Sequence, residues 1–443
     1  MWHKHLAAVD KHRQLILDAM AHIWRNPEPG YREWKTQEYM RAQFEALGYE
    51  LVLAGDVPGF YTVLDTGRPG PEVLVLGELD SLIIPDHPEA DRETGAVHAC
   101  GHHAQCAALL GIAAALREPG ALDGLSGRIR LCAVPAEELI EVEFRQQLKE
   151  QGIIRYMGGK TEFLHRGYFD GVDLAMMVHT GGGKVYSTVP GMVGCMAKRV
   201  VYQGRAAHAG GCPWDGVNAL YAAQQGLSAA NAIRETFHDE DYIRFHPIIT
   251  TGGSAVNAIP DRVVLESYVR GGSFKAMTEA ARRIDRALIG AALSLGANVD
   301  IQDSPGYAPL RQCTQLAELA GEAAKLAGLP FCHDPIMDTG STDMGDLSSV
   351  MPVVHPYAPG AVGRPHGVDY AIGDAELACV GSAKWQLVML HLLLEDGGRR
   401  GRDIAANFTP EFPGKADFFA YIDKLSRSGE RITYNGDKAE VQL

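Results

Sequence analysis

EVLVLGELD, residues 72–80, is a nearly continuous apolar run that ends in acidic residues. Such a run is typical of a strand that is buried on both faces of a parallel sheet. The same pattern recurs in IRLCAVPAEE (129–138), VDLAMMVH (172–179) and MPVVHP (351–356), and helical patterns such as residues 104–116 lie between the runs. This alternation predicts an α/β domain with a mostly parallel sheet and flanking helices.

Residues 193–306 show a different pattern. GCMAKRVVYQGRAAHAGG (194–211) alternates like a half-exposed strand, and helical patterns follow at 218–235 and 278–296. The β-α-β-β-α-β order predicts an inserted, ferredoxin-like α+β domain. We therefore expect a discontinuous catalytic domain (1–192 and 307–398), the inserted domain (193–306) and a polar, irregular tail (399–443) without an assigned role.

Composition and charge narrow the class of protein. The chain has 443 residues, of which 46% are hydrophobic and 22% are charged, as in an ordinary globular protein of two or three domains. Its net charge of -14 argues against a nucleic acid or an anionic membrane as partner. Residues 1–20 have helical spacing and lack the apolar core of a signal peptide, and the longest apolar stretch, 104–116, is too short to span a bilayer. We expect a cytoplasmic protein with reduced cysteines.

Candidate polar side chains lie at the ends of predicted strands and in the loop before the helix at 104–116. In open parallel sheets the functional crevice lies outside the carboxyl ends of the strands, so these side chains are expected to converge. Residues two apart, such as a cysteine and a histidine in HACGH, can meet in an extended loop. Thiolate, imidazole and carboxylate are ligands that zinc and similar divalent metals prefer. The residues concerned are Cys100, His102, Glu137, Glu138 and His179.

Other schemes explain fewer of these residues. A cysteine protease with Cys100 as nucleophile would leave the Glu pair and Asp80 without a role. The H-x-E with P-C-x-x-C pattern of zinc deaminases and the H-E-x-x-H pattern are absent from the sequence. GGKT at 158–161 lacks the earlier glycine of a phosphate-binding loop.

Blocks of sequence, matched in order over about residues 10–395, resemble peptidase family M20, which contains metal-dependent aminoacylases, carboxypeptidases and amidohydrolases. The last block is most similar to the branch with the p-aminobenzoyl-glutamate hydrolase subunits and the aminoacylase-1-like dipeptidases. The resemblance implies a zinc-exopeptidase type (phosphorylase/hydrolase-like) fold and a dimerisation role for the inserted domain. The blocks are GELDSL (77–82), HACGH (98–102), PAEE (135–138), MMVH (176–179), AAHAGG (206–211), GGSAVNAIPD (252–261) and GSTDMGDLSSVMPVVHP (340–356).

The resemblance implies a role for each matching residue. One or two divalent ions, manganese or zinc, are implied per subunit. Glu137 matches the general base, which takes a proton from the attacking water and passes it to the leaving nitrogen, and Asp80 matches the acid beside the metal. The implied metal ligands are Cys100, His102, Glu138, His179 and His366.

In the inserted domain, His208 matches a histidine that in this family stabilises the oxyanion in the active site of the partner subunit. Asn257 and Arg270 match positions that bind the substrate, often its carboxylate. The resemblance therefore implies a homodimer or a higher homo-oligomer that acts on a small molecule.

The sequence departs from the family pattern at three places. His103 follows His102 where relatives commonly carry Asp or Asn, and Glu78 stands where the family's exopeptidases have a metal-binding histidine. We include both among the candidate substrate-binding residues. Residues 139–157 form an insertion directly after the Glu pair and are expected to reshape the pocket.

These observations favour a metal-dependent hydrolase of a carbon-nitrogen bond, with the amide of an N-acyl or N-aroyl amino acid as the expected substrate. An alternative is hydrolytic deamination of an aromatic amine such as a nitroanthranilate, by enzymes that resemble the same family. A third hypothesis is a binding homologue without catalysis, although no expected ligand is missing from the sequence.

Overall fold

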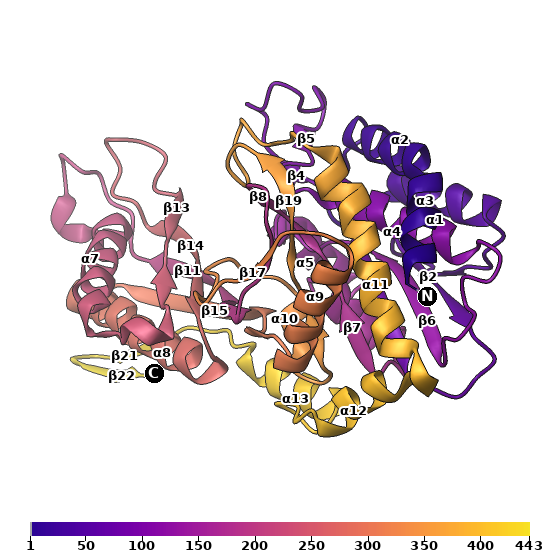
Figure 1. Cartoon of the computed structure of the whole chain (residues 1–443). Helices are drawn as coiled ribbons and strands as arrows, with labels where there is room; N and C mark the ends of the chain where they lie inside the picture. Colours follow the sequence, from indigo (N-terminus) through magenta and orange to yellow (C-terminus); the bar gives the residue numbers. More distant parts are fainter. Residues whose placement is uncertain (1) are drawn as a thin grey trace. The chain divides into compact units, whose positions relative to one another are not determined.

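The structure of this protein, a computed structural model, describes residues 2–443 and contains two compact units (Figure 1). Unit 1 consists of the residues up to Gly191 together with Leu310–Asp338 and Thr342–Lys415. Unit 2 consists of Met192–Pro309, Thr339–Ser341 and Ala416–Leu443.

Unit 1 is built on a six-stranded sheet in the order β1-β2-β6-β3-β7-β18. β6, β3, β7 and β18 are parallel to one another, whereas β2 pairs antiparallel with both β6 and β1. These parallel strands are the four apolar runs of the sequence, so the mostly parallel sheet is confirmed. The strands are β1 (Val52–Leu53), β2 (Phe60–Asp65), β3 (Glu72–Glu78), β6 (Arg128–Val134), β7 (Leu174–Met176) and β18 (Val353–Val354).

Helices pack against this sheet, which buries the apolar faces of both the helices and the sheet from water. α4 (His102–Leu116) is buried along its whole length and contacts β3, α1 (His3–Lys11), α2 (Arg13–Trp24) and α11 (Ser382–Leu394). The helical pattern at the N-terminus forms two helices, α1 and α2, which meet at His12. The other helices of unit 1 are α3 (Trp34–Ala46), α5 (Val142–Glu150), α6 (Gly159–His165), α9 (Thr314–Leu326), α10 (Met344–Ser348) and α12 (Arg399–Asn407).

A second, smaller sheet of unit 1 has the order β17-β9-β19-β20, with β8 paired to β19. β8 begins at His179, one of the candidate ligands, directly beyond the end of β7. The short strands are β4 (Leu82–Ile83), β5 (Ala96–Val97), β8 (His179–Gly182), β9 (Tyr186–Thr188), β17 (Phe331–His333), β19 (Tyr357–Val362) and β20 (Ala371–Ile372). β10 (Gly191–Met192) and β16 (Leu310–Arg311) lie where the chain passes from one unit to the other.

Unit 2 is an antiparallel sheet with two long helices. The strand order is β12-β14-β11-β15, and β13 also pairs with β14. Along the chain, β11, α7, β13, β14, α8 and β15 follow the β-α-β-β-α-β order, which is that of a ferredoxin-like fold. The elements are β11 (Gly194–Gln203), α7 (Ala219–Ala232), β12 (Arg244–Phe245), β13 (Ile248–Thr251), β14 (Arg262–Gly271), α8 (Phe274–Ser294) and β15 (Asn298–Tyr307).

The C-terminal segment, which we described as irregular from its sequence, contains regular structure. α12 belongs to unit 1, and after α13 (Lys415–Leu425) the chain forms a hairpin of β21 (Ile432–Asn435) and β22 (Lys438–Val441) in unit 2. Arg427 binds Asp303 of β15 and Asp285 of α8, at 2.6 Å and 3.0 Å. These contacts depend on residues far away in the sequence, which is why the local pattern gave no indication of them.

The longest apolar segment is not the one identified from the sequence. Among the described residues, Glu376–Leu394 is the one helical stretch that is long and apolar enough to cross a membrane, and most of it is buried inside the protein. Its burial matches a core helix of unit 1, where α11 packs against α4 and α9.

Candidate active site

The candidate ligands of unit 1 lie together beyond the ends of the parallel strands. In each of three groups the possible ligand atoms lie within 4.8 Å of one another. Cys100 and His102 belong to two groups each, so the groups form one continuous cluster. The groups are Cys100, His102 and His179; Cys100, Glu138 and His366; and Glu78, His102 and Glu137.

A tight turn at Gly101 presents Cys100 and His102 to this cluster. Gly101 has a φ of 95°, and a Cβ atom there would lie 2.1 Å from Oγ1 of Thr180 and 2.4 Å from the hydroxyl of Tyr370. Only glycine therefore fits, and α4 begins at the next residue. The Sγ atom of Cys100 lies 3.3 Å from Nε2 of His179.

Asp80, two residues beyond the end of β3, contacts two candidate ligands and is itself fully buried. Nδ1 of His102 lies 2.9 Å from the Asp80 carbonyl oxygen and 3.2 Å from its Oδ1. Both partners are acceptors, so Nδ1 carries a proton and Nε2 faces the cluster. The backbone N–H of Glu138 donates to the other carboxylate oxygen of Asp80, at 2.8 Å.

Buried polar atoms show that a divalent metal fits this donor set. Nε2 of His102 and Oε1 of Glu138 are buried and make no hydrogen bond among the described residues. Nε2 of His102 lies 3.1 Å from Oε2 of Glu78, and Oε1 of Glu138 lies 3.2 Å from Nε2 of His366. Burial, then the Glu138 charge, raises the pKa of the Cys100 thiol well above its ordinary value, so a thiolate needs a cation beside it. A metal would satisfy all these atoms.

Glu137 lies within the cluster but differs electrically from Glu138. Burial raises the pKa of Glu137 well above its ordinary value, and the Glu78 and Glu138 carboxylates raise it further. Burial opposes ionisation of Glu138 too, but His366 and His102 outweigh it and lower its pKa to about 2. Of the two neighbours, Glu137 thus holds a proton more readily, as a general base must, and Glu138 suits a ligand.

Lys160 is a part of the site that the sequence analysis missed. Its fully buried ammonium binds the carboxylates of Glu78 and Asp343. Burial raises the pKa of Glu78, but Lys160 and then His102 outweigh it and keep the carboxylate ionised. A Cβ at Gly159 would lie 1.7 Å from the carbonyl oxygen of Pro135, so this glycine allows the close approach. GGKT, considered from the sequence only as a phosphate loop, thus supplies a counter-charge.

His103 lies among aromatic rings and in none of the metal-binding groups found in the described residues. Its ring centroid is 4.9 Å from that of Trp24 and 5.3 Å from that of His98. Burial, and then the charge of His102, lower the pKa of His103 to about 3, so the ring is neutral. A role of His103 in substrate binding stays a prediction.

The C-terminal loop brings two histidines to the site. His366 has a φ of 60° and donates its backbone N–H to Ala99, at 2.9 Å, which holds it beside the Cys100 loop. His355 is buried, its Nδ1 lies 2.9 Å from the carbonyl oxygen of Met177, and its ring centroid is 5.7 Å from that of His179. His355 therefore packs behind a candidate ligand.

The remaining predicted residues belong to unit 2. His208 is exposed, and its Nδ1 accepts hydrogen bonds from the backbone of Gly210 and Gly211, at 3.2 Å and 2.9 Å, so the neutral ring carries its proton on Nε2. Asn257 accepts a backbone hydrogen bond from Ala209, at 2.9 Å.

Arg270 donates to the hydroxyl of Ser341, at 2.8 Å, and to Nε2 of His246, at 3.3 Å. The hydrogen bond between Ala209 and Asn257 brings His208 and Asn257 side by side within unit 2. The active-site roles of His208, Asn257 and Arg270 stay predictions.

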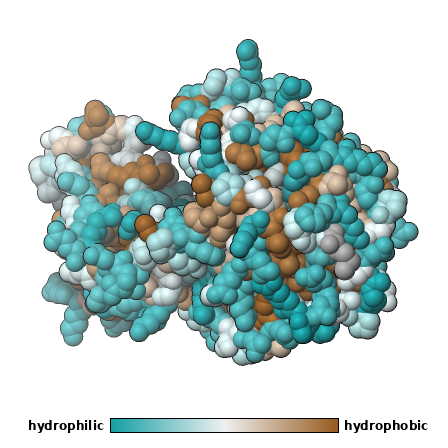
Figure 2. Space-filling model, in the orientation of Figure 1, coloured by the Kyte–Doolittle hydropathy of each residue, from teal (hydrophilic) through white to brown (hydrophobic). Residues whose placement is uncertain are grey.

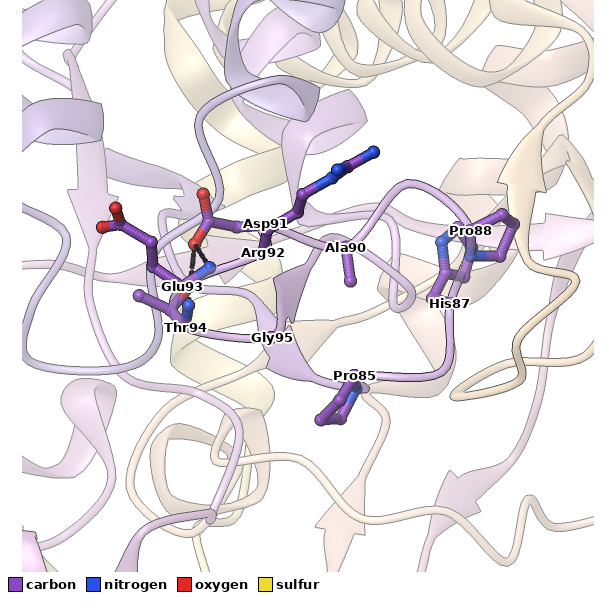
Figure 3. A pocket seen from close by; sticks show the side chains of 9 residues that line it. All are labelled: Pro85, His87, Pro88, Ala90, Asp91, Arg92, Glu93, Thr94 and Gly95. Atoms are coloured by element: carbon purple, nitrogen blue, oxygen red, sulfur yellow. Dashed lines mark hydrogen bonds between the residues drawn. The ribbon is translucent and has the colours of Figure 1, made fainter.

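A separate hollow of about 470 Å³ is formed by the loop 85–95 (Figure 3). Oδ1 of Asp91 accepts hydrogen bonds from the backbone and the hydroxyl of Thr94, at 2.8 Å and 2.7 Å, which closes the loop. None of the candidate site residues lines this hollow, and it has no place in the chemistry below.

Comparison with solved structures identifies the fold. A putative aminohydrolase from methicillin resistant Staphylococcus aureus superposes with a TM-score of 0.72 at 21% identity, over 89% of this chain and 100% of that one. The aminobenzoyl-glutamate utilization protein of Klebsiella pneumoniae gives a TM-score of 0.65 at 21% identity, over 88% and 98%. At these identities the likeness concerns the fold alone.

Relatives found by sequence are more nearly identical to this chain than those solved structures, but their alignments cover a smaller share of it. The Xaa-Arg dipeptidase of Mus musculus is 31% identical over 59% of this chain and 57% of its own length. A p-aminobenzoyl-glutamate hydrolase subunit of Escherichia coli (strain K12) is 30% identical over 66% of each chain. The match thus spans less than two thirds of the dipeptidase. Residues 74–382, more than half of the chain, match the profile of peptidase family M20/M25/M40. The chain belongs to this family.

Proposed function

We propose that this protein is a divalent-metal-dependent hydrolase that cleaves the amide of an N-acyl or N-aroyl amino acid. The observation that carries the proposal is the cluster of thiol, imidazole and carboxylate groups with the buried Glu137 inside it. Membership of family M20/M25/M40 supports it. So do relatives named p-aminobenzoyl-glutamate hydrolase, N-acetyl-L-cysteine deacetylase and indole-3-acetyl-aspartic acid hydrolase.

The residues of the cluster have distinct tasks in this proposal. A divalent cation, when bound, lowers the pKa of water from about 16 towards about 7 and polarises the scissile carbonyl. Zinc and manganese both suit the ligands, since thiolate favours zinc by softness and carboxylate suits manganese. The residues that would hold one or two ions are Cys100, His102, Glu138, His179 and His366.

Glu137 takes the proton of the attacking water and delivers it to the leaving nitrogen. Asp80 fixes the tautomer of His102 and the backbone of Glu138 through the hydrogen bonds described above. The Nε2–H group of His208 is a donor suited to an oxyanion, and such donors contribute roughly 3–4 kcal/mol elsewhere. Arg270 and Asn257 would bind the carboxylate of the substrate.

Unit 2 is proposed as the dimerisation domain, and residues 193–306 as its main part. Its edge strand β13 pairs only with β14 among the described residues and exposes Ile248 and Ile249. Hydrophobic residues also gather on the surface of this unit in Figure 2. An apolar edge strand favours pairing with a second copy.

A substrate panel tests the proposed reaction. Purified protein is incubated with N-acyl amino acids, aminobenzoyl-glutamate, Xaa-Arg dipeptides and substituted anthranilates, and the release of amine and of ammonia is assayed separately. We expect amine release from an acyl or aroyl amino acid, loss of activity on chelation, and a loss of several orders of magnitude in Glu137→Gln with metal content retained.

Glu143→Gln, an exposed change on α5, serves as the matched control and should leave turnover unchanged. Ammonia release from an anthranilate without amide cleavage would support the aromatic aminohydrolase instead. Near-normal turnover in Glu137→Gln would exclude Glu137 as the base. Absence of both products with every compound would favour the binding homologue.

A further inference from the structure

The insertion 139–157 places a buried arginine behind the Glu pair. The insertion contains α5, and Arg145 on this helix has one of the largest fully buried side chains in the protein. Its guanidinium donates to the carbonyl oxygens of Met157, at 2.8 Å, Ala136, at 3.4 Å, and Glu138. It lies 5.5 Å from the ring centroid of Tyr31. The two terminal nitrogen atoms thus bind backbone oxygens, whereas Nε makes no hydrogen bond among the described residues.

The two carbonyls of Ala136 and Glu138 flank Glu137, so one planar guanidinium bridges both sides of the candidate base. Arginine can do this because its donors form a rigid fork, whereas a lysine ammonium is a single point. A buried guanidinium whose hydrogen bonds go only to carbonyl oxygens loses hydration that these groups only partly replace. A side chain kept at that cost, at this place, indicates a task beyond filling space.

The turn that Arg145 holds is strained. Ala136 has a φ of 57°, a left-handed conformation that is unfavourable for a residue other than glycine. The buried Glu33 accepts the Ala136 N–H, at 2.7 Å, and Gly159 donates to the Ala136 carbonyl, at 3.2 Å. Such conformations persist only where the surroundings over-determine them, and Arg145 supplies bonds on both sides of Glu137.

α5 is also fixed to the loop that carries Glu33. Arg32 forms an ion pair with Glu141 at 3.0 Å and lies 4.0 Å from the ring centroid of Phe144. The insertion therefore contacts the segment that lies on the other side of the turn.

We propose that Arg145 is a positioning residue that clamps the 136–138 turn and so sets the direction of the Glu137 and Glu138 side chains. The proposal rests on the proposed function for its catalytic consequence, since a base displaced by about 1 Å loses roughly a hundredfold in rate. The part of the proposal that Arg145 holds the 136–138 turn rests only on the contacts described above. The insertion, in this view, acts on the base from behind instead of lining the pocket.

The test compares Arg145→Lys and Arg145→Gln with wild type and with Arg130→Lys. Arg130 serves as the control because it is a buried arginine on β6, the strand that leads to the Glu pair, and lies at the other end of that strand. It binds the carboxylate of Glu72 and donates to the carbonyls of Tyr168 and Asp170. Arg145→Gln is neutral, so it is informative if a buried ammonium prevents folding of Arg145→Lys.

Hydrogen-deuterium exchange of the peptide covering 135–140, measured in metal-free protein, reports how firmly the 136–138 turn is held. This measurement does not depend on enzyme activity. We expect faster exchange there in both Arg145 variants and unchanged exchange in Arg130→Lys. Zinc affinity, from competition with a chromophoric chelator, should fall about 10–100-fold, as for residues that orient metal ligands. With an active substrate, kcat should fall about a hundredfold with little change in KM.

Unchanged exchange at 135–140 in both variants would overturn the proposal, whatever the enzyme does. Lower thermal stability with unchanged exchange and zinc affinity would mean that Arg145 only supports folding. If wild type neither binds zinc nor cleaves any substrate, the proposed function fails, and the exchange measurement still decides whether the clamp exists.

Discussion

At the scale of single residues, the site is a balance of buried charges. Glu78, Asp80, Glu137, Glu138 and Asp343 all lie at less than a tenth of their full exposure. Five carboxylates so close together repel one another unless cations compensate them. Lys160 supplies one buried positive charge, bound to Glu78 and Asp343, and a divalent metal would supply more.

Lys160→Met should therefore destabilise the protein strongly. Removing one partner of a buried ion pair leaves uncompensated charge and typically costs about 3–5 kcal/mol. Equilibrium unfolding in urea measures the loss, with Lys184→Met, at an exposed lysine, as the control. The double variant Lys160→Met/Asp343→Asn should recover part of the loss because one unpaired charge is removed with the lysine. A single variant within about 0.5 kcal/mol of wild type would contradict this charge balance.

At the scale of elements, the strands and the helix beside the site were predictable because their patterns are local. A strand buried on both faces must be apolar throughout, and the helix between such strands must be too, so 72–80 and 104–116 read directly as β3 and α4. α13 and the C-terminal hairpin were not predicted, since long-range contacts such as that of Arg427 with Asp303 fix the segment between them. α12 was not predicted either.

The β13 edge gives a prediction about assembly. Ile248 is 62% exposed and Ile249 is 42% exposed, and we expect wild type to sediment as a dimer through this strand. Ile248→Lys places a charge on the edge and should shift the protein towards monomer. Val185→Lys, at an exposed valine of unit 1, should stay dimeric. A monomeric wild type at micromolar concentration, or an Ile248→Lys variant that dimerises normally, would count against this interface.

At the scale of the whole molecule, strand ends far apart in the sequence supply one cluster. The convergence of Cys100, Glu138 and His179 was predictable from the rule that parallel strands end at the same edge. The contributions of Lys160 and Arg145 were not, because each acts through a buried contact with no sequence pattern of its own. His103 shows the reverse case, since a residue next to a ligand along the chain packs against Trp24 instead.

The central claim is that this cluster, with Cys100 as thiolate, is a divalent-metal centre. The most direct test is the absorption spectrum of the protein after metal removal and loading with Co²⁺, because thiolate ligation adds a strong charge-transfer band in the near ultraviolet. We predict at least one bound ion per chain and this band in wild type and in Cys106→Ser. Cys106 is the control because its thiol donates to the Glu78 carbonyl, at 2.9 Å. Cys100→Ser should lose the band. No bound cobalt in wild type, or a band that survives in Cys100→Ser, would contradict the claim.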